Sequence, residues 1–333
     1  MAFGKFGAAL SAAEIHRLVA DDLSKVETFI NEECIGSVEQ IAEISRYLHS
    51  AGGKRIRPTL LLLACRLFQE PGKSAIHLAA VVEMIHAATL VHDDVIDTAT
   101  TRRGRPSANV IWGNHASVLA GDWMYMQAFQ VALRLRNFHV LDILISLTQM
   151  MVEGELIQLQ RIGRIDVSET DYMELIDRKT AALFAACARL GAVAGEADPA
   201  QESRLLDFAW NLGMAFQLVD DMLDFTAREK VLGKPVGNDL QEGKVTLPMI
   251  YALESATPQE RQLVETVLRD GNYSRVPLSR IQEFITERGG LERAKERAQF
   301  FTDRARARIA EFPESRYQQA LATVTELVTE RDR

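Results

Sequence analysis

Apolar residues recur at spacings of three and four along most of the chain, which is the period of a helix that buries one face. No run of alternating apolar and polar residues between turn signals indicates a strand, and only nine prolines interrupt the pattern. We therefore expect an all-α fold. The expected helices include 58–69, 74–97, 107–136, 138–163, 170–195 and 201–226, and shorter amphipathic helices follow Thr246.

The composition is that of an ordinary globular chain, with 47% hydrophobic residues and no linker segment, so we expect one domain over residues 1–333. A net charge of −8 argues against general nucleic-acid binding. No uninterrupted apolar run approaches the about 18 residues of a membrane span, and the N-terminus lacks the apolar run of a signal peptide. The three cysteines are far apart and form no metal motif, which predicts a cytoplasmic protein.

Two segments carry the pattern Asp-Asp-x-x-Asp at the end of an apolar helical stretch. In each motif the first and last aspartates are four residues apart, so their carboxylates share one helix face. Carboxylates on one face repel each other, and Mg²⁺ relieves this repulsion while binding substrate phosphates. Two copies favour a magnesium-bridged diphosphate site over a solvated acidic face. The motifs are Asp93, Asp94 and Asp97, and Asp220, Asp221 and Asp224.

Phosphate-binding residue types occur close to these motifs in the sequence. Arginine can bind phosphate oxygens with a two-pronged fork, and lysine acts as a point charge. The spacing of a P-loop is absent. Taken singly, each residue is more often structural: a basic loop that caps a helix, or an arginine pair that balances the aspartates. The candidates are Lys54 and Arg57 after a Gly-Gly pair, Arg102 and Arg103 after the first motif, and Lys179, Thr180, Gln217, Lys234 and Lys244.

Two histidines belong to the first aspartate helix. His86 lies two turns before Asp93, where a histidine is more often a satisfied core group than a ligand. His92, next to Asp93, is compatible with a metal-dependent phosphohydrolase of the HD type. That class requires further histidine and aspartate ligands, and the sequence does not supply them in suitable places.

Together these segments resemble the trans-polyprenyl diphosphate synthases, and among them most closely the bacterial octaprenyl members. The resemblance runs nearly end to end and keeps the family's order of motifs. It implies an all-α bundle around a central active-site cavity, a homodimer, and a prenyltransferase activity that serves quinone side chains. The segments that carry it are GGKRIRP, IHAATLVHDDVID, RRG, GNHASVLAGDW, KTAALF, FQLVDDMLD and GKPVGNDLQEGKVTLP.

The resemblance also implies roles for the candidate residues. Asp93, Asp97, Asp220 and Asp224 would bind about two to three Mg²⁺ ions, with Asp94 and Asp221 in support. Lys54, Arg57, His86 and Arg103 would hold isopentenyl diphosphate. Arg102, Lys179, Thr180, Gln217 and Lys234 would hold the allylic diphosphate, such as farnesyl diphosphate, with Lys244 nearby. The implied reaction is ionisation, condensation and loss of a proton, with Lys179 and the aspartates acting on the leaving diphosphate.

Product length is predicted from the helix that precedes the first motif. One helical turn advances about 5.4 Å, close to the length of one isoprene unit. Thr89 lies one turn below the aspartates, Ala88 beside it, and Ile85 one turn deeper. Short-chain members of the family carry aromatic residues there, so this chain predicts a product of roughly six to ten isoprene units. Met126 and Phe129 are candidates for the tunnel floor, with ordinary core packing as the alternative.

Other functions remain as alternatives at this stage. A terpene cyclase or a squalene-type synthase also uses aspartate-rich helices, but the basic GGKRIRP segment and the complete second motif argue against both. A shorter-chain geranylgeranyl or farnesyl synthase would use the same chemistry. A non-catalytic subunit of a heteromeric synthase is a further alternative, although such a subunit has no need for a full set of aspartates.

Overall fold

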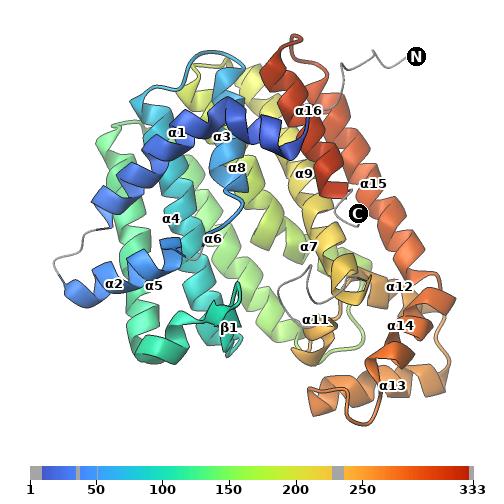
Figure 1. Cartoon of the computed structure of the whole chain (residues 1–333). Helices are drawn as coiled ribbons and strands as arrows, with labels where there is room; N and C mark the ends of the chain where they lie inside the picture. The colour runs from blue at the N-terminus through green and yellow to red at the C-terminus, as the bar shows by residue number, and fades with distance from the viewer. Residues whose placement is uncertain (1–9, 35–37, 51, 227–235, 330–333) are drawn as a thin grey trace. The chain divides into compact units, whose positions relative to one another are not determined.

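The computed structural model describes residues 10–34, 38–50, 52–226 and 236–329, and these are almost entirely helical (Figure 1). The predicted all-α fold is confirmed. The helices are α1 Ala12–Glu33, α2 Glu39–Ser50, α3 Ile56–Arg66, α4 Lys73–Ile96, α5 Ala108–Arg134, α6 Phe138–Arg161, α7 Glu169–Ile176, the π-helix η1 Asp177–Ala181, α8 Ala182–Ala194, α9 Pro199–Thr226, α11 Asn238–Gln241, α12 Leu247–Glu254, α13 Pro258–Asp270, α14 Leu278–Glu287, α15 Gly290–Ile309 and α16 Arg316–Thr329.

The chain divides into two compact units, and neither is one continuous segment. Each unit therefore draws its interior from parts that lie far apart in the sequence. The first aspartate motif belongs to unit 1 and the second to unit 2. Unit 1 comprises Met1–Ser146, Phe184–Asp207 and Arg308–Val324, and unit 2 comprises Leu147–Leu183, Phe208–Ala307 and Thr325–Arg333.

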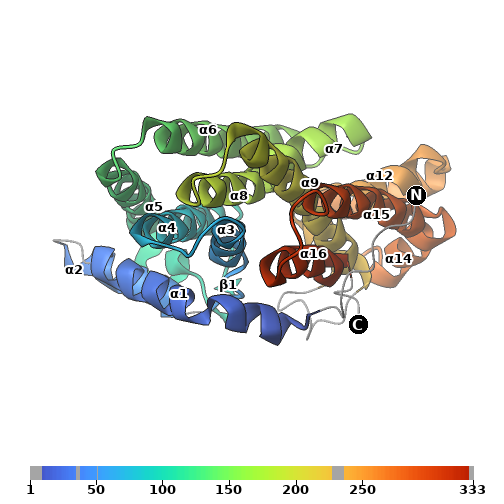
Figure 2. The same ribbon diagram turned by 90° about the horizontal axis from the view of Figure 1, so that it is seen from above.

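Helix α4 is the central element of unit 1. Figure 2 shows it between α3 and α5, with α1 crossing beside them, and α4 packs against all three. From Ala75 to Ile85 nearly every side chain is buried, because α4 is apolar on all sides rather than on one face. Its length and composition would also fit a membrane span, but 67% of its most apolar window is buried inside the protein. Its apolar residues therefore form the core of unit 1.

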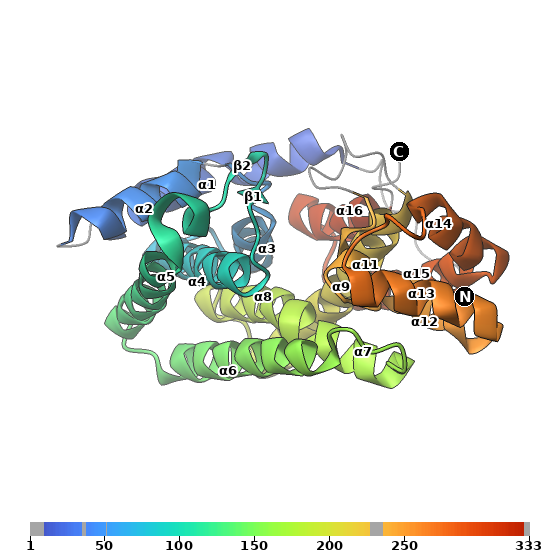
Figure 3. The same cartoon turned by 90° about the horizontal axis from the view of Figure 1, so that it is seen from below.

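A short hairpin follows α4 and carries the arginine pair. Strands β1 (Thr101–Arg102) and β2 (Arg105–Pro106) pair antiparallel, and the two residues between them, Arg103 and Gly104, have φ values of 52° and 74°. Two consecutive positive φ values match a tight type I′ hairpin loop. Figure 3 labels both strands of this hairpin. The hairpin is attached to α2, because the hydroxyl of Tyr47 donates to the Pro106 carbonyl at 2.7 Å. Strands of two residues are too short to give an alternating pattern in the sequence.

Unit 2 contains the second motif on the long helix α9. Phe301 of α15 packs edge-to-face on Trp210 of α9, and Gln282 of α14 donates to the Phe225 carbonyl at 2.7 Å. A capping box of Ser168 and Asp171 starts α7. The helix expected over 170–195 is helical throughout, but it contains the π-helical turn η1 between α7 and α8. The helix expected over 107–136 is interrupted by a kink at Gly113, whose φ of 82° and ψ of 162° are not helical. The other expected helices agree with the structure to within a few residues.

Candidate active site

The first aspartate motif occupies the last turn of α4. Asp93 and Asp97 are half-buried, whereas Asp94 is only 1% exposed. Arg102 of the hairpin holds the Asp94 carboxylate, with Nε and Nη2 at 2.7 and 2.5 Å from Oδ1. Burial raises the pKa of Asp94, and the Arg102 contact opposes that shift. The outer aspartates are therefore the accessible pair, and the middle one anchors an arginine.

Helix α5 covers one side of this motif at very short range. A Cβ atom on Gly121 would lie 2.2 Å from Nε2 of His92, so only glycine allows the two helices to approach this closely here. The His92 ring also lies near the Val118 carbonyl, at 3.1 Å, and stacks on Tyr125. His92 is thus engaged with α5. Its contacts give no support to an HD-type phosphohydrolase.

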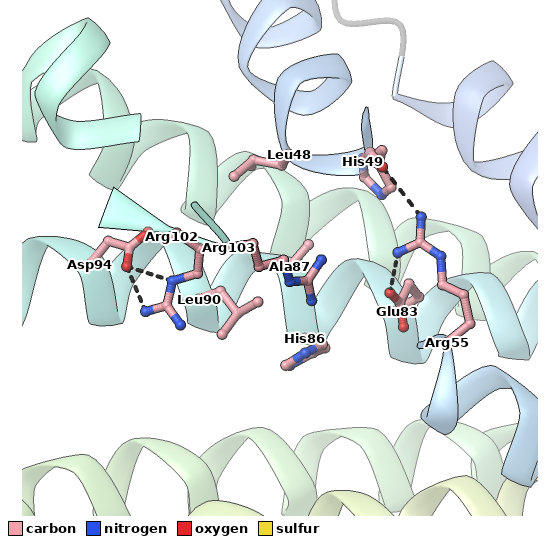
Figure 4. A pocket seen from close by; sticks show the side chains of 10 residues that line it. All are labelled: Leu48, His49, Arg55, Glu83, His86, Ala87, Leu90, Asp94, Arg102 and Arg103. Atoms are coloured by element: carbon pink, nitrogen blue, oxygen red, sulfur yellow. Dashed lines mark hydrogen bonds and ion pairs between the residues drawn. The ribbon is translucent and has the colours of Figure 1, made fainter. Parts of the chain in front are cut away.

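A pocket in unit 1 collects basic side chains from three directions, as Figure 4 shows. Helix α4 forms its floor, the hairpin contributes the arginine pair, and the region around α2 and the start of α3 closes the other side. This pocket brings together parts of both predicted diphosphate sites. Its lining residues are Leu48, His49, Arg55, Glu83, His86, Ala87, Leu90, Asp94, Arg102 and Arg103.

Arg57 and His86, two residues of the predicted isopentenyl diphosphate site, are in contact. Arg57 Nη1 lies 3.1 Å from Nε2 of His86, and the guanidinium also stacks over Phe184 at 5.6 Å from the ring centroid. Burial lowers the pKa of His86 well below its ordinary value, and the charges of Arg57 and Arg103 lower it further. Since arginine only donates, the neutral imidazole accepts through Nε2.

Arg103 lies against the Gly-Gly turn rather than in open solvent. Its guanidinium donates to the Gly52 carbonyl, and a Cβ atom on Gly53 would lie 2.9 Å from Nη1. Gly53 therefore makes room for Arg103, and Gly52, with a φ of 70°, gives the turn its shape. Lys54 follows as an exposed residue beside this contact. Three of the four predicted isopentenyl diphosphate residues, Arg57, His86 and Arg103, thus lie in or next to the pocket.

The second motif is organised by hydrogen bonds within unit 2. Asp221, only 5% exposed, accepts from the hydroxyl of Tyr172 at 2.6 Å and from Nε2 of Gln217 at 2.7 Å. Gln217 Oε1 in turn accepts from Thr180 at 2.7 Å. Burial raises the pKa of Asp221 to about 8, with a smaller contribution from Asp239, and the two hydrogen bonds oppose the shift. The predicted residues Thr180, Gln217 and Asp221 therefore form one connected chain.

Lys179 and Thr180 project from the π-helical turn. Lys179 Nζ contacts Glu155 Oε2 at 2.5 Å and Gln158 Oε1 at 3.2 Å, both on α6. Gly154 permits this approach, because a Cβ atom there would lie 3.0 Å from Cβ of Arg178. Single π turns inside α-helices occur frequently at functional sites. This turn has no signal in the sequence, since Lys and Thr also fit an ordinary helix.

Two residues near the second motif were missed by sequence reasoning. Asp239 is buried, and its backbone N–H donates to Oδ2 of Asp224 at 3.1 Å. Tyr172 is buried against Asp221. Asp239 lies in the segment GKPVGNDLQEGKVTLP, which was a usable signal. Of the predicted lysines, Lys244 pairs with Glu242 at 2.7 Å, and Lys234 lies outside the described residues.

The residues predicted to determine product length differ in how deeply the structure buries them. Ala88 is fully buried and packs with Val91 against Met124 of α5, and Ile85 is also fully buried. Thr89 donates its hydroxyl to the His86 carbonyl. Met126 is 64% exposed on the outer side of α5. Phe129 is half-buried. The buried methionine that faces Ala88 is Met124, which the sequence analysis did not single out.

The carboxylate set is suited to a hard cation that is completed by substrate. Among the described residues, no three histidine, cysteine, aspartate or glutamate side chains are close enough to enclose a metal ion. Mg²⁺ in proteins is commonly bound by one or two carboxylates together with substrate phosphates. The outer aspartates Asp93 and Asp97 offer this kind of partial site.

Comparison with known proteins agrees with these features. A family model described as "Polyprenyl synthetase" matches residues 38–283. The chain is 38% identical to octaprenyl diphosphate synthase of Escherichia coli K12, over 97% of this chain and 100% of that protein. It is 36% identical to geranylgeranyl diphosphate synthase of Sulfolobus acidocaldarius, over 79% of this chain and 82% of that one. A crystal structure of polyprenyl synthase from Caulobacter crescentus, complexed with calcium and isoprenyl diphosphate, superposes with a TM-score of 0.92 at 36% identity, covering 99% of this chain and 100% of that one.

Proposed function

Because the chain belongs to the polyprenyl synthetase family and is a trans-prenyl diphosphate synthase, we propose that it makes a long all-trans product of octaprenyl length. It would add isopentenyl diphosphate head-to-tail to an allylic diphosphate such as farnesyl diphosphate. One observation carries the length: the turns of α4 below Asp93 present Thr89, Ala88 and Ile85, with no aromatic side chain. The similarity to an octaprenyl synthase supports this choice, although a geranylgeranyl synthase is nearly as similar.

The isopentenyl diphosphate site is proposed in the basic pocket of unit 1. Arg57 and Arg103 offer guanidinium forks to the diphosphate oxygens, and Lys54 adds a point charge at the exposed edge. The neutral His86 accepts from Arg57 and orients it. The pocket thus presents positive charge while its floor, formed by Ala87 and Leu90 of α4, is apolar. That combination suits a small apolar group joined to a diphosphate.

The allylic diphosphate is assigned to Asp93, Asp97, Asp220 and Asp224 through bound Mg²⁺, about two to three ions in number. Bound metal would offset the charge that develops on the leaving diphosphate. Further residues assigned to this diphosphate are Arg102, Lys179, Thr180, Gln217 and Lys234, with Lys244 nearby. Arg102 is oriented by Asp94, and Gln217 by Asp221. Donors that are already fixed in place stabilise a developing charge without reorganising during the reaction.

The proposed chemistry requires no side-chain nucleophile. The allylic C–O bond breaks to give an allylic cation and free diphosphate. The double bond of isopentenyl diphosphate then attacks the cation and forms the new C–C bond, which moves the positive charge to the isopentenyl unit. A proton leaves the carbon next to that charge, and the electrons of the broken C–H bond form the new double bond. The released diphosphate is the proposed acceptor of that proton. The role of the protein is to hold both reactants in the orientation for attack.

A homodimer is proposed from an unusual apolar surface. On α5, Leu119, Met126 and Leu133 are exposed at intervals of seven residues. On α6, Phe138 and Ile145 continue with the same spacing. Rows of exposed apolar residues with a seven-residue period are typical of helices that pack against other helices. We propose a second copy of the chain as the partner, and a cytoplasmic enzyme whose product becomes a quinone side chain.

Product analysis tests the proposal. Purified protein is incubated with Mg²⁺, farnesyl diphosphate and labelled isopentenyl diphosphate, and the dephosphorylated products are sized by chromatography. A dominant alcohol of eight isoprene units is expected. A product of four units would keep the chemistry and replace the long-chain assignment by a geranylgeranyl synthase. Condensation with geranyl diphosphate but not with farnesyl diphosphate would indicate a farnesyl synthase, and absence of condensation with both primers would indicate a non-catalytic subunit.

A further inference from the structure

Arg55 lies between Lys54 and Arg57 in the sequence, yet its guanidinium contacts protein carboxylates instead of facing outward. Nη1 lies 2.6 Å from Oε1 of Glu83 on α4 (Figure 4), and Nε contacts Glu27 on α1. Nη2 is 3.4 Å from the His49 carbonyl on α2. The side chains of Arg55 and Glu83 are only 14% and 8% exposed. One guanidinium therefore joins α1, α2 and α4 at the start of α3.

The backbone of Arg55 is as unusual as its side-chain contacts. It is the N-cap of α3, with φ 47° and ψ 36°, a left-handed conformation that disfavours residues other than glycine. No side-chain hydrogen bond caps the helix here. Such a conformation persists only when the surrounding structure fixes it, and strained residues of this kind cluster at functional sites. The contacts with Glu27, Glu83 and His49 are the interactions available to fix it.

The position of Glu83 links this clamp to the pocket. Glu83 and His86 are three residues apart on α4, so both project from the same face of the helix. Glu83 holds Arg55, and His86 contacts Arg57 at 3.1 Å. A single helix face thus sets the positions of both arginines in the segment Arg55–Arg57. Lys54 directly precedes the clamped residue.

We propose that Arg55 is a positioning residue for the isopentenyl diphosphate site, and that it fixes the turn so that Lys54 and Arg57 present their charges to the same diphosphate. This inference rests on the proposed function. Arg55 does not bind the diphosphate itself, because two carboxylates already engage its guanidinium. It also neutralises Glu83, a carboxylate in the pocket wall that would otherwise repel an anionic substrate.

Arg55→Lys tests the proposal, because it keeps the positive charge and loses the fork that spans two carboxylates. We expect the KM for isopentenyl diphosphate to rise about tenfold or more. The KM for the allylic substrate, and kcat at saturating isopentenyl diphosphate, should change by less than about twofold. Arg55→Met should raise the KM for isopentenyl diphosphate more than Arg55→Lys does, because it leaves the charge of Glu83 without a neutralising partner.

Arg66→Lys is the matched control. Arg66 is the last residue of α3, and it is likewise buried and bound to a carboxylate of α1, Asp22, at 2.5 Å. It does not line the pocket. A purely structural role for Arg55 predicts that the two lysine variants behave alike, with lower thermal stability and an unchanged KM for isopentenyl diphosphate. That result, or equal rises in the KM values of both substrates, would overturn the proposal.

Direct binding separates this inference from the proposed function. Titration calorimetry with isopentenyl diphosphate requires no turnover. Wild-type protein that neither binds nor condenses isopentenyl diphosphate would overturn both assignments. If the wild-type protein binds isopentenyl diphosphate and a folded Arg55→Lys variant binds it with the same affinity, only the role of Arg55 would be overturned. Weakened binding in Arg55→Lys together with normal binding in Arg66→Lys would support it.

Discussion

Arg102 places Nε and Nη2 at 2.7 and 2.5 Å from one carboxylate oxygen of Asp94, the buried middle residue of the first aspartate motif. The second motif has a comparable arrangement, because its middle residue, Asp221, accepts hydrogen bonds from Tyr172 and Gln217. In both motifs the middle carboxylate is thus occupied by protein donors. In the first motif the structure therefore separates the half-buried outer aspartates from an occupied middle one. In the second motif the last residue, Asp224, is itself fully buried and accepts from the backbone N–H of Asp239.

The first prediction compares Asp93→Asn with Asp94→Asn. Loss of an outer carboxylate should lower kcat by about two to three orders of magnitude, the usual cost of losing one charge-stabilising group. Asp94→Asn should mainly raise the KM of the allylic substrate, since it frees Arg102 without removing an accessible carboxylate. Steady-state kinetics with each substrate varied in turn would measure both effects. Identical kinetic defects in the two variants would contradict this division of roles.

The second prediction concerns acid stability and His86. Burial, with the charges of Arg57 and Arg103, lowers the pKa of His86 in the folded protein. As pH falls, the unfolded chain therefore binds a proton at this residue at a higher pH than the folded protein does. The resulting stability is present above about pH 6.5 and is lost as pH falls, by up to about 1.4 kcal/mol per pH unit.

Denaturant unfolding of wild type and His86→Asn between pH 5 and 8 measures this effect. The variant should lose less free energy of unfolding than wild type on acidification, whatever its stability at neutral pH. His16→Asn, which changes an exposed histidine, is the control and should follow wild type. Parallel pH profiles for wild type and His86→Asn would rule out His86 as a source of the acid sensitivity.

The third prediction concerns product length. Ala88→Phe should shorten the product to about three or four isoprene units, because a ring would project into the space one turn below the aspartates. Ala88 is fully buried against Met124, so the larger side chain should also cost about 1–3 kcal/mol of stability. The double variant Ala88→Phe with Met124→Ala should recover stability. Products are sized by chromatography. A product of unchanged length from Ala88→Phe would contradict the proposal that α4 determines product length.

The fourth prediction concerns the close contact between α6 and the π-helical turn. A methyl group in Gly154→Ala would lie 3.0 Å from Cβ of Arg178 and 3.2 Å from the backbone nitrogen of Lys179. The turn must shift, so the KM of the allylic substrate should rise several-fold while that of isopentenyl diphosphate stays constant. Gly72→Ala is the matched control, because nothing lies within 4 Å of its added methyl group. Equal behaviour of the two variants would show that the contact has no role in substrate binding.

The sequence predicted most of the fold because the helices of the cores are long and strongly periodic. It placed the first motif at the end of an apolar helix, and α4 does end at Ile96 with Asp97 as its cap. Its alternative interpretation of the arginine pair, as a balance for the aspartates, describes what Arg102 does at Asp94. It could not single out this pairing, since Arg102 reaches Asp94 only through the geometry of a two-residue hairpin loop. The sequence also does not predict the π-helical turn η1, because the residues of this turn are compatible with an α-helix.

The choice between Met124 and Met126 shows a different limit of the sequence. Helix α5 is apolar on its buried side and on its exposed side, so hydrophobicity alone does not define which side faces the interior. The sequence analysis selected Met126 as a floor candidate, but the structure buries Met124 and exposes Met126. An exposed apolar helix face resembles a core in the sequence, because both show the same residue types.

The fifth prediction follows from that exposed row on α5. Leu119→Glu with Met126→Glu places two charges at positions seven residues apart on one helix face. If a second copy covers this face, burying the charges should cost several kcal/mol and shift the protein from dimer to monomer in analytical ultracentrifugation. Gln262→Glu, at an exposed residue of the different helix α13, adds one charge outside the row and should leave the mass unchanged. A dimer that persists in the double variant would show that the partner binds elsewhere, and the apolar row would then need another explanation.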